Sequence, residues 1–189
     1  MRTIAVALLH YPILDRAGEI VTTAITNLDL HDIARSAHSF GISDYFVVHP
    51  VAAQRELAER VRAHWVGGSG ARRIPERRPP MERLRIVETL DEVFSTPGWQ
   101  EGAEMWTTSA AAEGADVLRY RDARAMLRRP GPPVLLVFGT GWGLAPSVHE
   151  RASARLEPIR SPRTDGFNHL SVRAAAAISF DRLLAPESR

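Results

Sequence analysis

The 189-residue chain contains no cysteine and no lysine, and none of its apolar runs is long. The lack of cysteine excludes disulfides, thiolate nucleophiles and cysteine-ligated zinc sites, and it fits a reducing compartment such as the cytoplasm. No apolar run approaches the roughly 20 residues that span a bilayer. We therefore expect a soluble protein with no membrane partner and no metal site. The apolar start, residues 1–10, has no small-residue cleavage site and is interpreted as a strand.

Arginine supplies all 24 basic residues, against 22 acidic ones, and the net charge is +2. The arginines cluster in residues 72–85 and again in residues 119–129. Because arginine binds phosphate through two hydrogen bonds and stacks on bases, both clusters are candidates for contact with nucleic acid. The alternative is a solvated surface in a protein from a GC-rich genome.

Length and a hydrophobic content of 44% predict one compact domain covering residues 1–189. Strand-like runs alternate with helical patterns along the chain. This order predicts an α/β fold with a mainly parallel sheet and helices on both faces. The expected strands are residues 3–9, 45–49, 85–90, 104–107, 134–138 and 155–159.

The first predicted helix has the clearest boundaries, with Asp29 as its N-cap and Gly41 just after its end. Residues 52–65 predict a second helix. Residues 71–80 contain three prolines and four arginines, so we expect a surface loop with no packed element. Further helices are expected at residues 91–94, 120–129 and 146–153, and after a cap at Asn168 or Ser171.

Residues 134–144 form a continuous apolar run that breaks into three alternate glycines, Gly139, Gly141 and Gly143. This pattern is typical of a strand buried on both faces that ends in a loop lying against a ligand. The carboxyl end of a parallel strand is the usual ligand position in open α/β sheets. The glycine spacing and late position do not fit a dinucleotide fingerprint, and no Walker lysine follows. A purely structural tight turn is the alternative.

Two other stretches supply polar groups next to predicted elements. Thr108 and Ser109 follow the strand at 104–107, where they offer hydroxyls to a ligand or form a simple helix cap. Residues 165–177 place a capping residue before a run of alanines, which allows the helix to pack closely on a sheet or another chain. Function depends on whether these stretches and the glycine loop form one pocket.

Three stretches, in chain order, resemble the three motifs of the SPOUT methyltransferases, the trefoil-knotted enzymes that transfer a methyl group from S-adenosylmethionine (SAM) to RNA. They run from Asn27 to Gly41, from residue 137 to 144 and from residue 168 to 178. Residues 9–12 and 26–32 are also similar to a bacterial single-domain subfamily, often encoded beside or fused to the tRNA guanine-N1 methyltransferase. The resemblance implies a C-terminal trefoil knot, a homodimer and RNA (tRNA or rRNA) as substrate.

The resemblance also implies that SAM lies bent between three loops. Backbone amides at the glycine-rich turns would bind its polar groups, and apolar side chains would cover the adenine. The cofactor-binding residues implied in this way are Thr108, Ser109, Ala110, Phe138, Gly139, Thr140, Gly141, Gly143, Leu144, Ile159, Asn168, His169, Leu170 and Ser171.

For catalysis, the resemblance implies that Arg35 and Asn27 position the substrate. The ribose-methylating branch has a glutamate between the first two glycines of its second motif, and this chain has none. That departure argues against ribose methylation. The guanine-N1 branch uses an aspartate in the last knot loop as base, a region that here contains Asp165. Asp165 is therefore the candidate proton acceptor, with a turn-forming Asp-Gly as the alternative.

The sequence thus predicts a cytoplasmic, SAM-dependent RNA methyltransferase. Two other hypotheses stay open at this point: an unrelated nucleotide-binding α/β enzyme, and a non-catalytic RNA-binding protein that retains the knotted fold.

Overall fold

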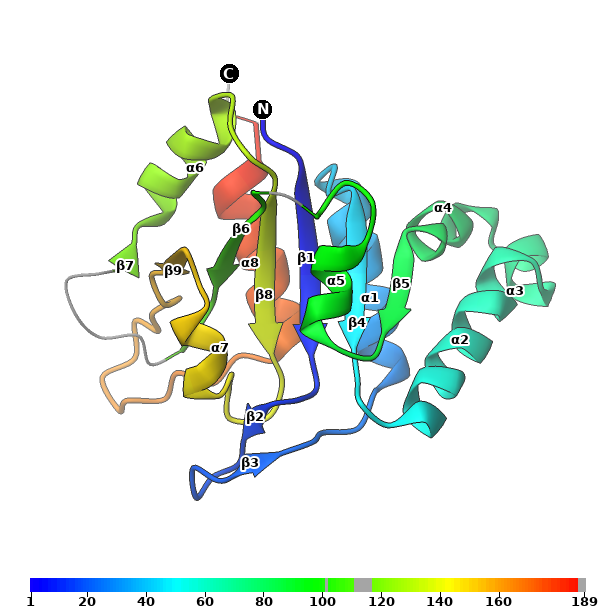
Figure 1. Ribbon diagram of the computed structural model, residues 1–189, viewed down its shortest axis with the longest axis horizontal. Helices are drawn as coiled ribbons and strands as arrows, with labels where there is room; N and C mark the ends of the chain where they lie inside the picture. Colours follow the sequence, from blue (N-terminus) through cyan, green and yellow to red (C-terminus); the bar gives the residue numbers. More distant parts are fainter. Residues whose placement is uncertain (101, 111–116, 187–189) are drawn as a thin grey trace.

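A single parallel sheet of seven strands organises the chain (Figure 1). The computed structural model describes residues 1–100, 102–110 and 117–186. Within that part the strand order is β5-β4-β1-β8-β6-β9-β7, and each neighbouring pair is parallel. The strands are β1 (Ile4–Leu9), β4 (Asp44–Val48), β5 (Leu84–Val87), β6 (Glu104–Thr107), β7 (Val117–Leu118), β8 (Val134–Gly139) and β9 (Ala154–Leu156).

The two central strands, β1 and β8, are apolar along their length because the sheet is covered on both faces. Alternate residues of β1 point to opposite sides: Val6 and Leu8 belong to one hydrophobic cluster, and Ala7 and Leu9 to the other. β1 and β8 run in register, with Leu9 beside Gly139. Both strands therefore end at the same edge of the sheet, where the predicted glycine loop begins.

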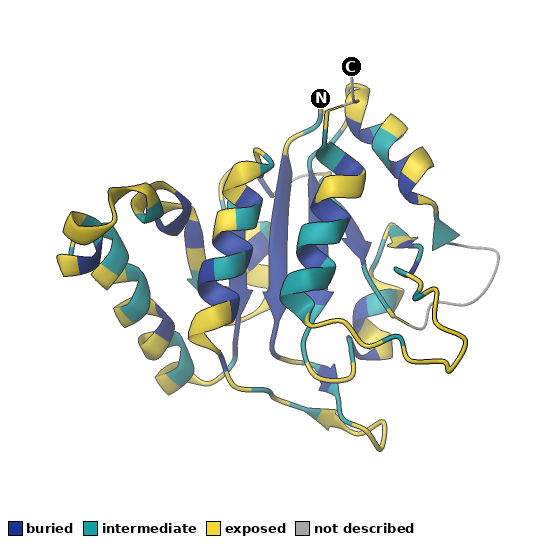
Figure 2. Cartoon of the chain, turned by 180° about the vertical axis from the view of Figure 1, so that it is seen from behind, coloured by how far each residue is buried: buried dark blue, intermediate teal, exposed yellow. Residues whose placement is uncertain are grey.

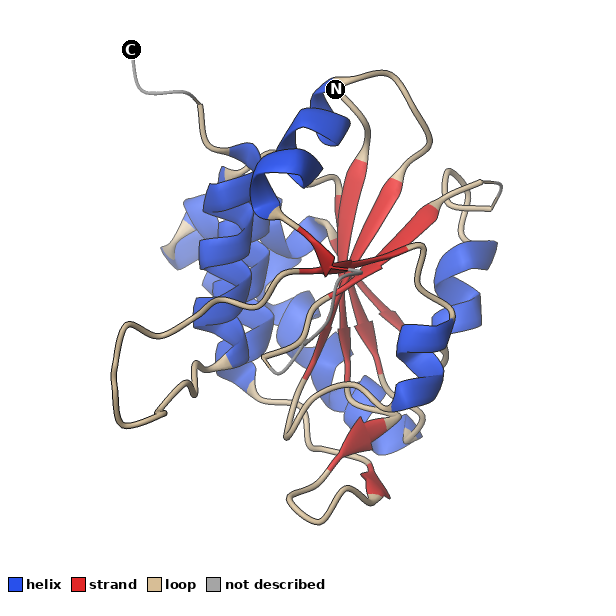
Figure 3. Ribbon diagram, turned by 90° about the vertical axis from the view of Figure 1, so that its left-hand side faces the viewer, coloured by secondary structure: helices blue, strands red, loops and turns tan. Residues whose placement is uncertain are grey.

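Helices cover both faces of the sheet (Figure 3). One face carries α1 (Asn27–Ser39), α6 (Tyr120–Arg128) and α8 (Val172–Leu184); the other carries α5 (Leu90–Ser95) and α7 (Pro146–Glu150). Beside β5, a lobe is formed by α2 (Ala52–Val66), α3 (Ser69–Arg73), η1 (Pro75–Arg77) and α4 (Arg78–Glu82). We call these elements the α2–α4 lobe. No helix of the described residues is long and apolar enough to cross a membrane.

The prediction of a mainly parallel sheet with helices on both faces is confirmed. The prediction that residues 71–80 form no packed element is wrong, because they fold into short helices. Their prolines stand in first turns, where no backbone N–H is needed, and Pro80 and Met81 are buried. The structure also contains two elements that the sequence analysis does not predict: β7, and a two-stranded hairpin of β2 (Ile13–Leu14) and β3 (Ile20–Val21).

The N-cap residues of α1 and α8 show where these two helices begin. The prediction of Asp29 as the N-cap of α1 is wrong: Thr26 is the cap, and its hydroxyl accepts the N–H of Asp29 at 3.1 Å. Both residue types are good caps, and the earlier one starts the helix. For α8, Ser171 is the cap, accepting the N–H of Ala174 at 3.3 Å. The prediction that Gly41 follows α1 is confirmed, and its φ is +74°.

Candidate active site

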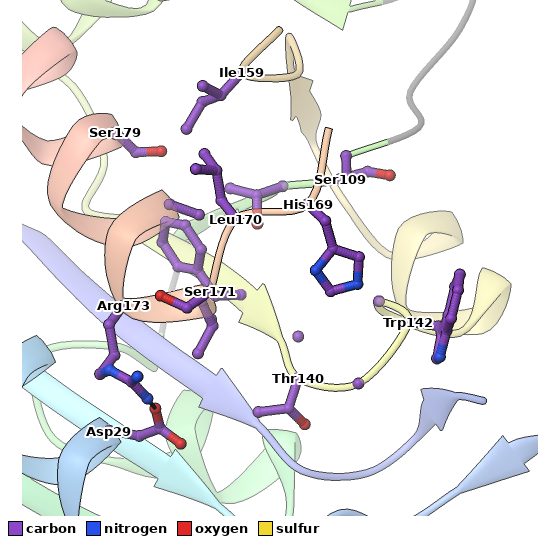
Figure 4. Close-up of a pocket in the computed structure, with 18 of the residues that line it drawn as sticks. Asp29, Ser109, Thr140, Trp142, Ile159, His169, Leu170, Ser171, Arg173 and Ser179 are labelled. Atoms are coloured by element: carbon purple, nitrogen blue, oxygen red, sulfur yellow. Dashed lines mark hydrogen bonds and ion pairs between the residues drawn. The ribbon is translucent and has the colours of Figure 1, made fainter. Parts of the chain in front are cut away.

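A cavity of about 640 Å³ opens at the carboxyl ends of the central strands (Figure 4). Its size is in the range of small-molecule sites. It is lined by the loop after β6, the glycine loop after β8 and the segment that leads into α8, together with residues around the start of α1. The three stretches that the sequence singled out therefore meet in one pocket.

Every predicted cofactor-binding residue except Leu144 lines this cavity. The lining residues from that prediction are Thr108, Ser109, Ala110, Phe138, Gly139, Thr140, Gly141, Gly143, Ile159, Asn168, His169, Leu170 and Ser171. Leu144 is buried beneath the loop instead, where it forms a bridge with Ile13 of the hairpin.

The cavity has both apolar and polar surface (Figure 4). Ile159 and Leu170 provide apolar surface toward one end, where the hydroxyl of Ser179 also lies, and Phe138 adds apolar lining. At the other end lie the hydroxyl of Thr140 and the ion pair of Asp29 with Arg173. Such a site suits a ligand with a flat apolar part and a separate polar part.

An aromatic rim borders the cavity. Trp142 is 58% exposed and its ring meets His169 edge to face, with centroids 5.9 Å apart. Phe167, 62% exposed, lies 6.4 Å from the same histidine. Figure 2 shows that much of the segment leading into α8 is exposed, so these rings are accessible to a ligand larger than the cavity.

The hairpin β2–β3 holds the glycine loop from outside. The N–H of Trp142 donates to the carbonyl of Leu14 at 3.0 Å, and the N–H of Leu14 donates to Gly143 at 2.9 Å. Gly141 has φ +56°, and a Cβ there would lie 2.9 Å from Cγ2 of Ile13. Gly141 therefore allows the loop to pack against its own chain, a role the sequence did not reveal because the hairpin was not predicted.

A partly buried chain of hydrogen bonds fixes Thr140 at the floor of the cavity. The hydroxyl of Thr140 donates to the carbonyl of Leu9 at 3.3 Å, so Thr140 accepts from the hydroxyl of Thr23. Thr23 in turn accepts from Nδ1 of His10 at 3.0 Å. This direction assigns the Nδ1–H tautomer to His10. His10 itself is fully buried.

The two histidines behind the cavity are neutral. Burial, and then the nearby His49, lower the pKa of His10 to about 4. Burial likewise lowers the pKa of His49, whose Nε2–H donates to the carbonyl of Thr23 at 2.9 Å and whose Nδ1 accepts from Val51 at 3.1 Å. The floor of the cavity is thus a preset array of neutral donors and acceptors.

The ion pair between Asp29 and Arg173 is a feature that sequence reasoning missed. Nη1 of Arg173 donates to Oδ1 of Asp29 at 2.7 Å, and the hydroxyl of Thr26 donates to Oδ2 at 2.7 Å. The Asp29 side chain is only 7% exposed. The pair joins the start of α1 to the first turn of α8. No local signal predicts it, because the two residues are 144 positions apart.

The three predicted catalytic residues lie outside the cavity lining. Arg35 and Asn27 are exposed on α1, and Asn27 lines a different groove. Asp165 is exposed in the segment before α8, where it accepts from Nε of Arg163 at 2.9 Å and from the N–H of Phe167 at 3.1 Å. The hydrogen bond from Arg163 lowers the pKa of Asp165. Within one chain, therefore, these residues do not meet the cavity.

The chain is similar to known proteins in both sequence and fold. The profile of a family described as SAM-dependent RNA methyltransferase matches residues 3–185. The chain is 40% identical over 183 residues to a tRNA (guanine-N(1)-)-methyltransferase of Oleidesulfovibrio alaskensis, covering 97% of this chain and 42% of that protein. The chain thus spans less than half the length of this relative.

Two solved structures have a similar fold. A probable methyltransferase from Bordetella pertussis aligns with a TM-score of 0.63 at 17% identity, covering 96% of this chain and 94% of that one. A TrmH/SpoU tRNA modifying enzyme from Aquifex aeolicus aligns with a TM-score of 0.57 at 13% identity, covering 97% and 75%. The fold is that of the SPOUT proteins, and the chain belongs to the family of SAM-dependent RNA methyltransferases.

Proposed function

We propose that this chain catalyses methyl transfer from SAM to an RNA, tRNA or rRNA, in the cytoplasm. The observation that carries the proposal is the convergence of three distant loops on one cavity that offers both apolar and polar surface. The relative named as a tRNA methyltransferase makes tRNA the first substrate to test. Because the chain spans 42% of that relative, the assay must begin from total tRNA and rRNA rather than from one nucleotide.

The residues of the cavity fit SAM. Phe138, Ile159 and Leu170 offer an apolar surface for the adenine, and the loop at 139–143 offers backbone groups and the Thr140 hydroxyl for polar atoms. Bound SAM would supply a methyl group on a positively charged sulfonium. The chain has to orient the acceptor atom in line with that methyl and exclude water from it. The rim of Trp142 and Phe167 offers ring faces on which an RNA base can stack.

The accepting atom also has to lose its proton, and we propose Asp165 as the group that takes it. The hydrogen bond from Arg163 lowers the pKa of Asp165, so this bond makes the carboxylate a weaker base while it lasts. For Asp165 to accept a proton, the bond to Arg163 has to be released as RNA enters. We further propose that the chain works as a homodimer with a threaded α8, so that Asn27 and Arg35 of one protomer serve the cavity of its partner.

The proposal is tested in two steps, binding and then transfer. Calorimetric titration with SAM and S-adenosylhomocysteine is expected to give saturable binding. Incubation with methyl-labelled SAM is expected to label total tRNA or rRNA. Labelling of neither RNA, despite cofactor binding, would favour a non-catalytic RNA-binding protein. Lack of cofactor binding by the folded chain would contradict the proposed function.

The role of Asp165 has a matched control. Asp165→Asn is expected to lower turnover by about 100-fold or more, the usual contribution of a general base, with unchanged cofactor affinity. Asp122→Asn removes another exposed aspartate beside an arginine, Arg121, on α6, and is expected to change neither quantity. Undiminished turnover of Asp165→Asn would remove it from the mechanism.

A further inference from the structure

We call the cavity at the carboxyl ends of the strands the donor cavity, because SAM is the proposed methyl donor. A second depression lies on the other flank of α1. It is a groove of about 510 Å³ between the start of α1 and the length of α2. Asn27, which opens α1, lines this groove, whereas Asp29, two residues later, lines the donor cavity. The full set of groove residues is Asn27, Leu57, Arg60, Val61, His64 and Trp65. None of the residues proposed to bind SAM lines this groove.

The groove combines an apolar surface with cationic groups. Leu57, Val61 and Trp65 are partly exposed apolar residues on one side of α2. The guanidinium of Arg77 stacks over the Trp65 ring, 4.8 Å from its centroid. A guanidinium that lies over a ring face can keep N–H groups available for an anion. Arg60 adds a second guanidinium at the groove itself.

Some arginines of the α2–α4 lobe are paired with carboxylates, and others are not. Arg62 and Arg78 form ion pairs with Glu59 and Glu82. For the side chain of Arg60, by contrast, no hydrogen bond or carboxylate partner is found among the residues that the structure describes. The same holds for the side chains of Arg35, Arg72 and Arg73, and for that of Arg77 apart from its contact with Trp65. Residues 52–83 contain eight arginines and four glutamates. The groove is therefore a place where positive charge is left uncompensated.

His31 lies among the same cationic groups. It lies on the same helical face as Asn27 and Arg35, at four-residue intervals, and its ring meets the edge of Trp65 at 5.1 Å. Burial lowers its pKa most; Arg77, Arg35 and His64 lower it further, against the opposing effect of Asp32. Arg77 from the lobe and Arg35 from α1 thus act on one spot beside the groove.

We infer that this groove binds a single-stranded segment of the substrate RNA, apart from the nucleotide that is methylated. A base or ribose rests on Leu57, Val61 and Trp65, while Arg60 and Arg77 bind flanking phosphates. Unpaired arginines beside an aromatic surface suit RNA, which carries both phosphates and flat bases. An acidic protein would pair with the arginines but would leave the aromatic surface without a matching group. The inference rests on the proposed function only in taking RNA as the ligand.

The arrangement predicts a kinetic consequence. Arg60 and Arg77 are not among the residues proposed to act at the methyl group, and α1 separates them from the cavity of their own chain, so their contacts contribute to holding RNA and not to the chemistry. Loss of groove contacts is therefore expected to raise the KM for RNA and to leave kcat unchanged.

The test uses Arg60→Gln, Arg77→Gln and the double variant, with Arg62→Gln on the same helix as the matched control. The probes are a fluorescently labelled single-stranded oligouridylate and unfractionated tRNA, titrated over a series of salt concentrations. The double variant is expected to bind about tenfold more weakly. Its log–log salt slope is expected to be shallower by about 0.7 for each lost phosphate contact. Arg62→Gln is expected to match the wild type, and SAM affinity is expected to be the same in all four.

Trp65→Leu tests the aromatic contact with a different signature. It is expected to weaken RNA binding while leaving the salt slope as in the wild type, since no phosphate contact is lost. Thermal unfolding of each variant separates a binding defect from a folding defect. Because the two arginines have no ion pairs to lose within the described part of the chain, their variants are expected to fold normally.

The outcomes separate this inference from the proposed function. If the wild type methylates RNA and the groove variants bind RNA as the wild type does, the groove inference is wrong and the function stands. If RNA binding depends on the groove but no methyl is transferred, the inference stands and the function fails. A wild type that binds neither probe overturns the inference. So does a shift of oligomeric state by groove variants at unchanged RNA affinity, which would identify an interface between copies.

Discussion

The donor cavity and the α1–α2 groove lie on opposite flanks of one helix, yet their polar groups are held in opposite ways. In the cavity, Thr140, Thr23 and His10 are bonded to one another, and Asp29 is paired with Arg173. In the groove, the described residues leave Arg60 without a carboxylate partner. The polar groups of the cavity are therefore mostly bonded to one another, although Nε2 of His10 is buried without a partner among the described residues, whereas the groove has an unpaired cationic side chain.

This difference indicates what each site can recognise. Buried polar groups that satisfy one another are stiff, so the cavity has its shape and its donors fixed before a ligand arrives. Exposed arginines lose little by staying solvated and gain when a polyanion releases its counterions. The cavity is thus suited to one small molecule of defined shape, and the groove to a chain of phosphates with variable sequence.

The largest change in SAM affinity is expected for Gly141→Val, which distorts the cavity and leaves the groove intact. A side chain at φ +56° is strained, and its Cβ would lie 2.9 Å from Ile13, so the loop has to move. Together the two costs reach about 3 kcal/mol, which predicts about a 100-fold loss of SAM affinity by calorimetry. Gly67→Val, where a Cβ meets nothing within 4 Å, is the control. Equal SAM affinity in both variants would show that the glycine loop does not shape the site.

The next effect concerns the ion pair at the polar end of the cavity. Asp29→Ala or Arg173→Ala leaves its partner charge unmatched, which costs 3–5 kcal/mol for a fully buried pair. Since the Arg173 side chain is 30% exposed, we expect about 2 kcal/mol of lost stability in urea unfolding. The double variant is expected to lose less than the sum of the single ones. Strict additivity would mean that the pair does not couple α1 to α8.

A pH-dependent effect is expected at the floor of the cavity. His10 has a pKa of about 4 in the folded chain and about 6.5 when unfolded, so the unfolded state takes up the proton first as the pH falls. The stability that neutral His10 supports is complete above about pH 6.5 and is lost as the pH falls toward 4. Between pH 7 and 5 the wild type is expected to lose about 2 kcal/mol more than His10→Asn, which keeps a donor toward Thr23. Parallel pH profiles would contradict the buried, neutral assignment.

Much of the fold and the cavity could be predicted from local patterns. The apolar run of β8 and its alternate glycines identified a buried strand with a ligand loop, because burial on both faces leaves a continuous apolar signature. The cofactor residues came from the resemblance, and the family match removes the alternative of an unrelated nucleotide-binding enzyme. Their place in one cavity required the sheet order, which brings β6 and β8 side by side.

What could not be predicted depends on residues far apart in the sequence. Nothing near Asp29 indicates Arg173, and a capping role was the simplest local interpretation. The hairpin that holds Gly141 is two residues long on each strand, too short for an alternating pattern. The three prolines of residues 71–80 predict a loop because proline breaks a helix interior, whereas in the structure they stand in first turns, which tolerate proline.

The smallest effect is expected for the arginines of the α2–α4 lobe, and it completes the comparison. Arg60→Gln and Arg73→Gln each remove an exposed charge for which the described residues provide no hydrogen bond. Each is therefore expected to change the free energy of unfolding by less than about 0.5 kcal/mol. Urea titrations of these variants and of Asp29→Ala at pH 7 compare the free energy of unfolding lost at the groove with that lost at the cavity. A loss above about 1 kcal/mol for Arg60→Gln would make that side chain structural. A small loss of stability together with weaker RNA binding would indicate that the Arg60 guanidinium binds a phosphate of the RNA, because its removal then affects the complex and not the fold.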